Sequence, residues 1–334
     1  MTKMEIRKLQ TTAAGTFIVT IPKEWTEKLA MQKGDLVSVE LEENDIVISP
    51  TRIKPSPQSK SLDIDQFKDQ KLLELCITAS YIQGHDITEI VSASKINPDQ
   101  KRWIRQAVEG LIGVEIAEDY AGRVVLQNLI DPSKFQINKL LEKFSTTSSA
   151  VFQDAINALI QNDLTLAQDA YERGEQSTKI YRLLMRQALQ ASRSRKIRVE
   201  MELQDISNVV VKIIATRELG RMAYYAMRIA QHVSEVDKKL EPQLTATIQK
   251  MAKMTVEMQE QSLKALLTRD LNLASTIIDT MINVRKLYES AYSLIPRNSD
   301  RSSLALSLII RDIRAVAGYA VALADDAVLG VFEE

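Results

Sequence analysis

The sequence contains a single cysteine, Cys76, and only two histidines, His85 and His232. One cysteine excludes an internal disulfide framework and a cysteine-ligated zinc site, and so few histidines disfavour a histidine-rich metal site. An apolar signal core is absent at the N-terminus, and the longest uncharged apolar run near the C-terminus covers only residues 315–324. We therefore expect a cytoplasmic protein in a reducing compartment, without membrane insertion and without a cofactor.

The sequence motifs of common enzyme classes are missing as well. There is no G-x-x-x-x-G-K-S/T phosphate loop, no G-x-G-x-x-G, no G-x-S-x-G and no plausible Cys/His pair. The chain is therefore predicted not to be an enzyme. Its 43 basic and 44 acidic residues nearly cancel, so binding to nucleic acid must come from a local basic patch.

Three regions follow one another along the chain. Residues 1–50 have β-strand texture around one short helix, which predicts a β-β-α-β-β unit. Residues 51–61 are polar, contain two prolines and are predicted to form a linker. Residues 62–131 combine strand-like segments with two helices, the second of which starts after Asn97-Pro98, and predict a small α/β module. The sequence does not indicate the function of this module, which could be a spacer or a dimer contact.

Beyond residue 132 apolar residues recur at three- and four-residue steps, as in amphipathic helices. Two motifs occur twice in this region. RELGRMAYYAMRIA at 217–230 aligns without gaps to RDIRAVAGYAVALA at 311–324. DLTLA, which starts at Asp163, and DLNLA, which starts at Asp270, continue in the same register to KIY and KLY. Each aspartate is placed to cap the helix that follows it.

The repeat predicts two tandem three-helix bundles, over residues 132–238 and 239–334. The spacing between the two motifs is longer in the first copy, which predicts an insertion around residues 192–205. The expected helices cover residues 134–161, 164–192, 205–238, 243–268, 271–294 and 301–328.

The duplicated third helices, with R-(D/E)-(L/I) followed by A-x-Y-A, resemble the PhoU family of phosphate uptake regulators over roughly residues 132–330. Separately, RKLQ, GTFIVTIPKEW, KGD and IVISP in residues 1–50 resemble the SpoVT/AbrB swapped-hairpin DNA-binding domain. The order of the regions is similar to that of archaeal phosphate uptake regulators. The resemblance implies a multidomain, mainly α fold with an AbrB-like swapped β-hairpin domain, a small α/β module and two PhoU-like three-helix bundles.

The N-terminal unit is predicted to need a second copy of itself. Phe17, Val19 and Ile21 alternate toward one face of a strand, and Pro22 both ends that strand and fits the first turn of a helix. Two apolar residues of this helix are expected to turn inward: Trp25 and Leu29. Because a core built from roughly 45 residues is marginal in a single chain, we expect the unit to interleave with a twin in a homodimer.

Charge in the same unit is separated by sign. Residues 1–33 carry net positive charge, whereas residues 35–45 carry acids and no base. This pattern alone fits a solvated strand surface, but together with the resemblance it favours a surface for double-stranded DNA, since phosphate contacts supply most non-specific affinity. The residues expected to contact DNA are Arg7 and Lys8, then Lys23 and Lys3, with Thr11 and Thr12 as hydrogen-bond donors to phosphate.

The PhoU resemblance implies E/D-x-x-x-D in the third helix of each bundle, which places two carboxylates one turn apart for a metal ion. The matching positions are Gly220 and Tyr224 in the first copy, and Arg314 and Gly318 in the second. Both acidic pairs are missing, so we expect no intrinsic metal. Asp312 and Glu218 remain, and they are interpreted as salt-bridged surface or groove residues.

Arg217 and Arg311 are equivalent in the repeat, as are Tyr225 and Tyr319. These residues could form an anion or partner site related by pseudo-symmetry. The interpretation that we favour is structural, with each arginine paired to a nearby carboxylate and the tyrosines bridging helices.

The leading hypothesis from this resemblance is a DNA-binding transcriptional regulator of phosphate homeostasis. Its helical region would sense phosphate status through a partner, such as the ATP-binding subunit of a phosphate ABC transporter. One alternative is a signalling adaptor in which the N-terminal unit only dimerises. Another is antitoxin-like binding of a partner protein by the hairpin domain.

Overall fold

The structure is a computed structural model of the whole chain, and it describes seven segments. These segments are residues 4–42, 45–51, 57–131, 134–203, 205–237, 239–296 and 300–329. The chain divides into two compact units, Met1–Pro57 and Gln58–Glu334. Among the helices that the structure describes, none combines the length and apolar character needed to cross a bilayer.

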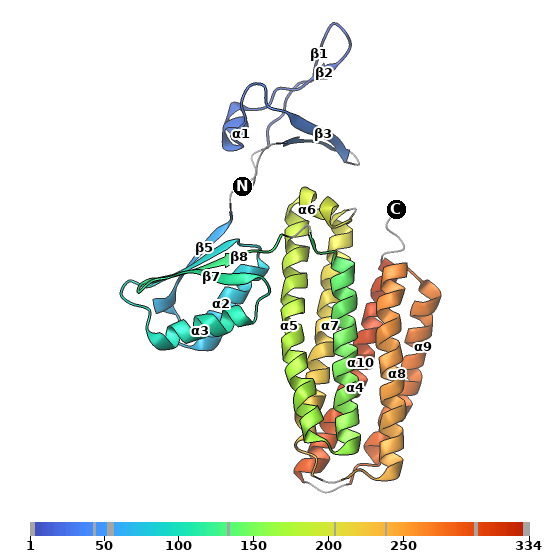
Figure 1. Cartoon of the computed structure of the whole chain (residues 1–334). Coiled ribbons are helices and arrows are strands. Elements are labelled where there is room, and N and C mark those ends of the chain that lie inside the picture. Colours follow the sequence, from blue (N-terminus) through green and yellow to red (C-terminus); the bar gives the residue numbers. More distant parts are fainter. Residues whose placement is uncertain are drawn as a thin grey trace. The chain divides into compact units, whose positions relative to one another are not determined.

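The N-terminal unit has the predicted β-β-α-β-β order (Figure 1). Its elements are β1 (Gln10–Thr11), β2 (Phe17–Ile18), α1 (Lys23–Lys28), β3 (Val37–Glu42) and β4 (Asp45–Pro50). β1 and β2 form one antiparallel hairpin and β3 and β4 another. Gly15 adopts φ +82° in the first turn, a conformation that glycine takes without strain.

Two local predictions in this unit were wrong. The strand β2 ends at Ile18, so it does not extend to Ile21, and Pro22 is the N-cap residue of α1, just before the first turn. Trp25 and Leu29 are not buried in a core: the two residues are 37% and 42% exposed. Of the described residues before residue 52, none is buried. A single copy of this short segment does not have enough chain to cover its own apolar residues.

The second unit begins with the α/β module. Its elements are β5 (Ser59–Asp63), the short 3-10 helix η1 (Ile64–Gln66), α2 (Gln70–Ile82), β6 (Ile87–Val91), α3 (Pro98–Glu109), β7 (Val114–Asp119) and β8 (Arg123–Asn128). The sheet order is β5-β6-β8-β7, with β5 parallel to β6 and the other pairs antiparallel. Asn97 and Gln100 form a capping box ahead of α3.

The predicted linker was wrong at its C-terminal end. Residues 59–61 belong to β5, which pairs with β6 along its whole length. The segment is polar except for Leu62, so its sequence resembles a loop. It is a strand because backbone groups of β6 pair with it, a tertiary effect that local composition does not report.

The predicted long helices are confirmed within a few residues. They are α4 (Ile137–Gln161), α5 (Leu164–Arg193), α7 (Ile206–Val233), α8 (Pro242–Thr268), α9 (Leu271–Ser293) and α10 (Arg301–Leu329). A short helix, α6 (Arg195–Glu200), lies in the predicted insertion. Asp163 and Asp270 each cap the following helix as predicted, through 3.0 Å hydrogen bonds from the amides of Leu166 and Leu273.

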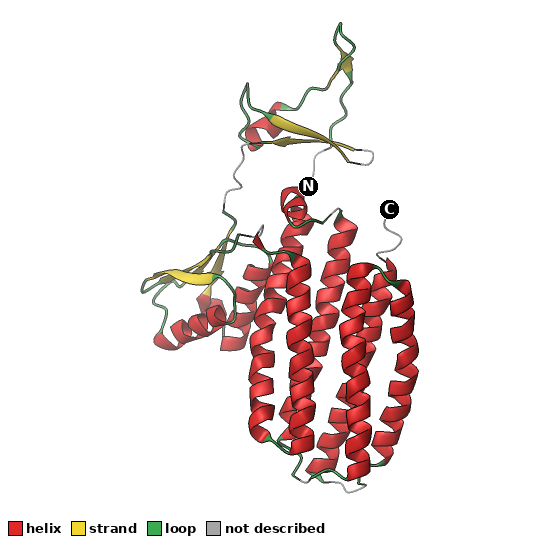
Figure 2. Cartoon of the chain, turned by 45° about the vertical axis from the view of Figure 1, so that its right-hand side comes forward, coloured by secondary structure: helices red, strands yellow, loops and turns green. Residues whose placement is uncertain are grey.

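The two three-helix bundles share one apolar core. Their long helices run side by side (Figure 2). α7 packs against α4, α5 and α10, while α10 packs against α7, α8 and α9, and α4 also contacts α8. The same buried cluster includes residues from both bundles, such as Phe152, Leu184, Leu219, Met251, Ile277 and Ile313. The α7–α10 contact therefore joins the two repeats along their third helices.

Three arginines of α5 attach the α/β module to the first bundle. Arg182 donates to the carbonyl of Gly110 at 3.0 Å, where α3 ends. Arg193 donates to the carbonyl of Gln83 at 2.7 Å, at the C-cap of α2. Both contacts supply donors to carbonyls that a helix end leaves without partners.

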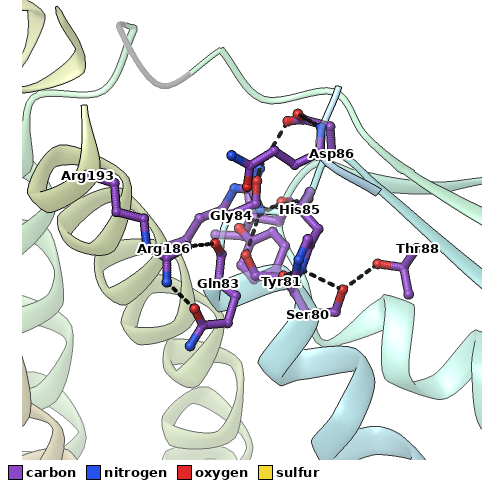
Figure 3. Close-up of polar contacts among 11 residues, drawn as sticks. Ser80, Tyr81, Gln83, Gly84, His85, Asp86, Thr88, Arg186 and Arg193 are labelled. Carbon is purple, nitrogen blue, oxygen red and sulfur yellow. Dashed lines mark hydrogen bonds and ion pairs between the residues drawn. The ribbon is translucent and has the colours of Figure 1, made fainter. Parts of the chain in front are cut away.

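The third of these arginines, Arg186, is 1% exposed and makes the central contact (Figure 3). It donates to the carbonyls of Tyr81 at 2.6 Å, His85 at 3.0 Å and Gly84 at 3.3 Å. Its guanidinium carbon lies 5.0 Å from the centre of the Tyr81 ring, and its Nη2 lies 3.6 Å from Asp86. Burial lowers the pKa of Arg186 and raises the pKa of Tyr81 to about 12.

Replacing this buried arginine should loosen the attachment of the module. In Arg186→Met the carbonyls at the end of α2 lose their donor, and we expect a loss of about 3 kcal/mol in the free energy of unfolding. The matched control, Arg193→Met, removes an exposed arginine of α5 that also contacts the end of α2. It should lower the free energy of unfolding by less than about 1 kcal/mol. Urea unfolding followed by circular dichroism gives both values, and equal losses in the two variants would contradict the assignment.

Candidate functional site

The residues predicted to contact DNA lie on the first hairpin and at the start of α1. Arg7 and Lys8 precede β1, Thr11 ends β1, Thr12 starts the hairpin turn, and Lys23 begins α1. All are exposed except Thr12, which is half-buried. Lys3 lies outside the described residues.

The basic residues of this surface make only weak contacts within the unit. The Arg7 guanidinium lies 2.5 Å from Glu5, and the Lys23 ammonium lies 3.4 Å from Glu27. Exposed ion pairs of this kind contribute little free energy, so both cations can exchange their partner for another anion. The Thr12 hydroxyl oxygen accepts a 3.2 Å hydrogen bond from the amide of Thr16, and its proton remains able to donate.

In the helical region, the third helices α7 and α10 meet in an antiparallel pair. Tyr225 and Tyr319, which are equivalent in the repeat, stack at 5.7 Å between ring centres. The prediction that these tyrosines bridge the two helices is confirmed. The stack therefore marks the middle of the contact between the two copies.

The positions where the family has acidic pairs are filled differently in the two copies. In the first copy Gly220 lets Tyr181 pack directly on α7, because a Cβ at residue 220 would lie 2.9 Å from the Tyr181 ring. In the second copy the guanidinium carbon of Arg314 lies 4.9 Å from the ring centre of Tyr288, the repeat equivalent of Tyr181. Across the described residues, no three acidic, histidine or cysteine side chains gather closely enough to hold a metal ion.

Asp312 is a core residue, so its interpretation as a surface or groove residue was wrong. Its side chain is fully buried between α10 and α7. One carboxylate oxygen accepts hydrogen bonds from Arg311, at 2.9 Å from Nη2, and the other lies 3.3 Å from Nε of Arg228. Burial raises the pKa of Asp312, and the hydrogen bonds from Arg311 oppose that rise. The predicted pairing of an arginine with a carboxylate is confirmed for Arg311.

Glu218, the repeat equivalent of Asp312, has a different neighbourhood. It is half-buried, and one of its carboxylate oxygens is buried without a hydrogen-bond partner. Burial raises the pKa of Glu218, and the charges of Arg217 and Arg221 oppose that rise. Glu218 faces Asp326 of α10, whose pKa is raised to about 6 by burial and by the charges of Glu218 and Asp325.

The sequence analysis missed this acidic pair, although the repeat contains a signal for it. Extending the alignment of the third helices beyond residue 230 matches His232 with Asp326. Across the helix pair, the charge of His232 acts to lower the pKa of Asp312, and the charge of Glu218 acts to raise the pKa of Asp326. One end of the helix pair therefore combines an acid with bases, and the other combines two acids.

These features coincide with two known families. The profile of the family described as PhoU domain matches residues 141–233 and 248–327, together more than half of the chain. The chain belongs to the PhoU domain family. Residues 10–56 match a second profile, described as antidote-toxin recognition MazE, bacterial antitoxin. The N-terminal unit is thus a MazE/AbrB-like domain, and both resemblances expected from the sequence are confirmed.

One solved structure supports a similar helical fold, and a second is included with it for comparison. The structure of PhoU from Pseudomonas aeruginosa is similar with a TM-score of 0.53 and 18% identity, covering 60% of this chain and 97% of that one. The phosphate transport system regulatory protein PhoU from Streptococcus pneumoniae has a TM-score of 0.49 and 17% identity, covering 60% of this chain and 98% of that one. A comparison with curated proteins finds no match.

The acidic pair predicts a pH-dependent stability. Because the pKa of Asp326 is raised in the folded state, the folded protein binds the proton more tightly than the unfolded chain. Stability is therefore fully present below the ordinary pKa and is lost as the pH rises through about 6. Asp326→Asn should raise the free energy of unfolding by about 2 kcal/mol above roughly pH 7 and change it little below roughly pH 4.

Urea unfolding at these two pH values tests the prediction for Asp326. The control variant Asp279→Asn removes an exposed acid of α9 and should have no such pH-dependent effect. A gain in Asp326→Asn that is equal at both pH values would exclude titration of this carboxyl as its cause.

Proposed function

We propose that the protein is a cytoplasmic, DNA-binding transcriptional regulator of phosphate uptake. The observation that carries the proposal is the presence in one chain of a MazE/AbrB-like unit and a complete pair of PhoU-type helical repeats. The similar P. aeruginosa structure is that of a PhoU protein, and the PhoU family that the third helices resemble is a family of phosphate uptake regulators. The transfer of that role to this chain is part of the proposal.

The N-terminal unit pairs with a second copy of itself. Its apolar side chains are exposed in the single chain, and they come from both hairpins and from α1. Examples are Phe17 (67% exposed), Val39 (63%), Leu41 (76%) and Ile46 (70%). Apolar surface on this scale in so short a segment is the mark of an interface, because monomeric proteins rarely leave large contiguous apolar patches in water. Interleaving two copies would give both a shared core.

The dimer has a direct test. Light scattering of the full chain should give about twice the monomer mass of 37.6 kDa. Phe17→Asp places a charge where the second copy would cover the ring, and should shift the particle toward the monomer mass. Ile278→Asp, at an exposed apolar residue of α9, is the matched control and should leave the mass unchanged. A monomeric wild-type chain would overturn the pairing of the N-terminal unit.

DNA binding would use the first hairpin and the start of α1. Arg7, Lys8 and Lys23 are exposed cations there, whereas the acids of residues 35–45 follow α1 and extend into the second hairpin. Thr11 and Thr12 add hydroxyl donors beside the cations. Paired in a dimer, this surface and Lys3 would offer roughly eight basic contacts to duplex phosphates, which corresponds to a salt slope of about −7.

The DNA surface can be tested by mobility-shift assays on duplex DNA across a range of salt concentrations. Arg7→Ala combined with Lys8→Ala removes four contacts from a dimer and should reduce the slope to about −4, with weaker binding to all sequences. Lys250→Ala combined with Lys253→Ala removes the same charge from the exposed face of α8 and should leave both values unchanged. If duplex DNA is not bound even at low salt, the regulator does not act on DNA.

The helical region would control DNA binding through a partner, for which the ATP-binding subunit of a phosphate ABC transporter is our candidate. Such a partner must bind one arrangement of the protein better than another, since equal affinity for both changes nothing. The contact between α5 and the α/β module provides a route for this control. Arg186 pairs with Asp86, and the second carboxylate oxygen of Asp86 accepts a 2.9 Å hydrogen bond from the amide of Gln58, where the second unit begins.

Two other functions remain as outcomes of the same experiments. A dimer that binds the transporter subunit but not DNA would be a signalling adaptor. The MazE match, described by toxin recognition, favours as a further candidate the capture of a partner protein by the hairpin domain. Pull-down of a specific protein by wild type but not by Phe17→Asp, without DNA binding, would support that function.

A further inference from the structure

A cavity of about 310 Å³ lies between α5 and α7, beside the Gly220 position. Its lining residues include Phe144, Thr178, Tyr181, Arg217, Arg221 and Tyr224. Since Gly220 carries no Cβ, the Tyr181 ring packs directly against α7, and it also lines the cavity. The remaining lining includes Ala223 and Met227, so the cavity combines an apolar interior with cations at its mouth.

Neither arginine of this cavity forms a close ion pair with a carboxylate inside the described residues. Arg217 and Arg221 are one turn apart on α7, both are exposed, and neither forms a hydrogen bond or an ion pair there. The charges of Arg217 and Arg221 act on the half-buried Glu218, but within the described residues Glu218 forms no ion pair with either arginine. Two adjacent guanidinium groups therefore point to solvent with their donors unused.

In the second copy of the repeat, by comparison, the arginines contact other side chains of the protein. Arg311, the equivalent of Arg217, donates to Asp312, and Arg314 lies over the ring of Tyr288. Both arginines of the second copy are thus engaged in internal contacts. The guanidinium groups of Arg217 and Arg221 in the first copy make no such contact within the described residues.

We propose that this cavity binds a phosphoryl group, held by the forked donors of Arg217 and Arg221. Guanidinium groups match the oxygen geometry of phosphate and bind it through paired hydrogen bonds. The volume is at the lower end of small-molecule sites, so a bare phosphate ion would leave the tyrosine walls uncovered. An organic phosphate with a flat body would also stack on Tyr181 and Tyr224. The site goes beyond the proposed regulation and does not depend on DNA binding.

Isothermal titration of the full chain with AMP, inorganic phosphate and adenosine tests the site and separates its two sources of phosphoryl group. We expect AMP to bind with a Kd on the order of 0.1 mM, phosphate roughly tenfold more weakly, and adenosine not measurably. Equal affinity for phosphate and AMP would assign the site to free phosphate. Arg217→Gln combined with Arg221→Gln should weaken either ligand by roughly a hundredfold, a tenfold loss for each arginine.

Two further variants make the result specific. Arg285→Gln combined with Lys286→Gln removes the same charge from the exposed face of α9 and should leave binding intact. Thr178→Glu keeps both arginines and places a carboxylate at the mouth of the cavity, so it should also abolish binding. The proposal is overturned if neither AMP nor phosphate binds, if the α9 control loses binding equally, or if both cavity variants bind like the wild type.

Discussion

The insertion of Arg186 into the carboxyl end of α2 is the contact on which the organisation of the second unit depends. A helix end leaves several carbonyls without partners, and one guanidinium can satisfy a group of them because it has five donors. Arg186 does this at Tyr81, Gly84 and His85 while almost completely buried. The same side chain pairs with Asp86, which also holds the amide of Gln58. The α/β module and the start of the second unit are thereby fixed to α5 together.

Much of the helical fold was predictable because its signals are local and occur twice. Asp163 and Asp270 mark helix starts in equivalent places, and the repeat around Tyr225 and Tyr319 identifies the third helices. The attachment of the module was not predictable, since an arginine on a helix such as Arg186 has the same local pattern whether it faces water or another helix end. Partners distant in sequence determine such a contact.

The candidate sites were also predictable only in part. The resemblance to the PhoU family identified Gly220, Tyr224, Arg314 and Gly318 as the positions where the acidic pairs are missing, but it did not predict what fills the space there. The cavity beside Gly220 and the burial of Asp312 both depend on packing between helices. In the N-terminal unit the order of strands and helix was predicted correctly, whereas the alternation of Phe17, Val19 and Ile21 did not give the extent of β2, which ends at Ile18.

The stacked Tyr225 and Tyr319 lie between two ends of the α7–α10 contact that are equivalent in the repeat. Asp312 meets Arg228 and Arg311 at one end, and Glu218 meets Asp326 at the other. Duplication by itself would give a partner two equal places to bind. Divergence of these few side chains makes the two ends of the helix pair chemically different, so the two copies no longer present equivalent surfaces.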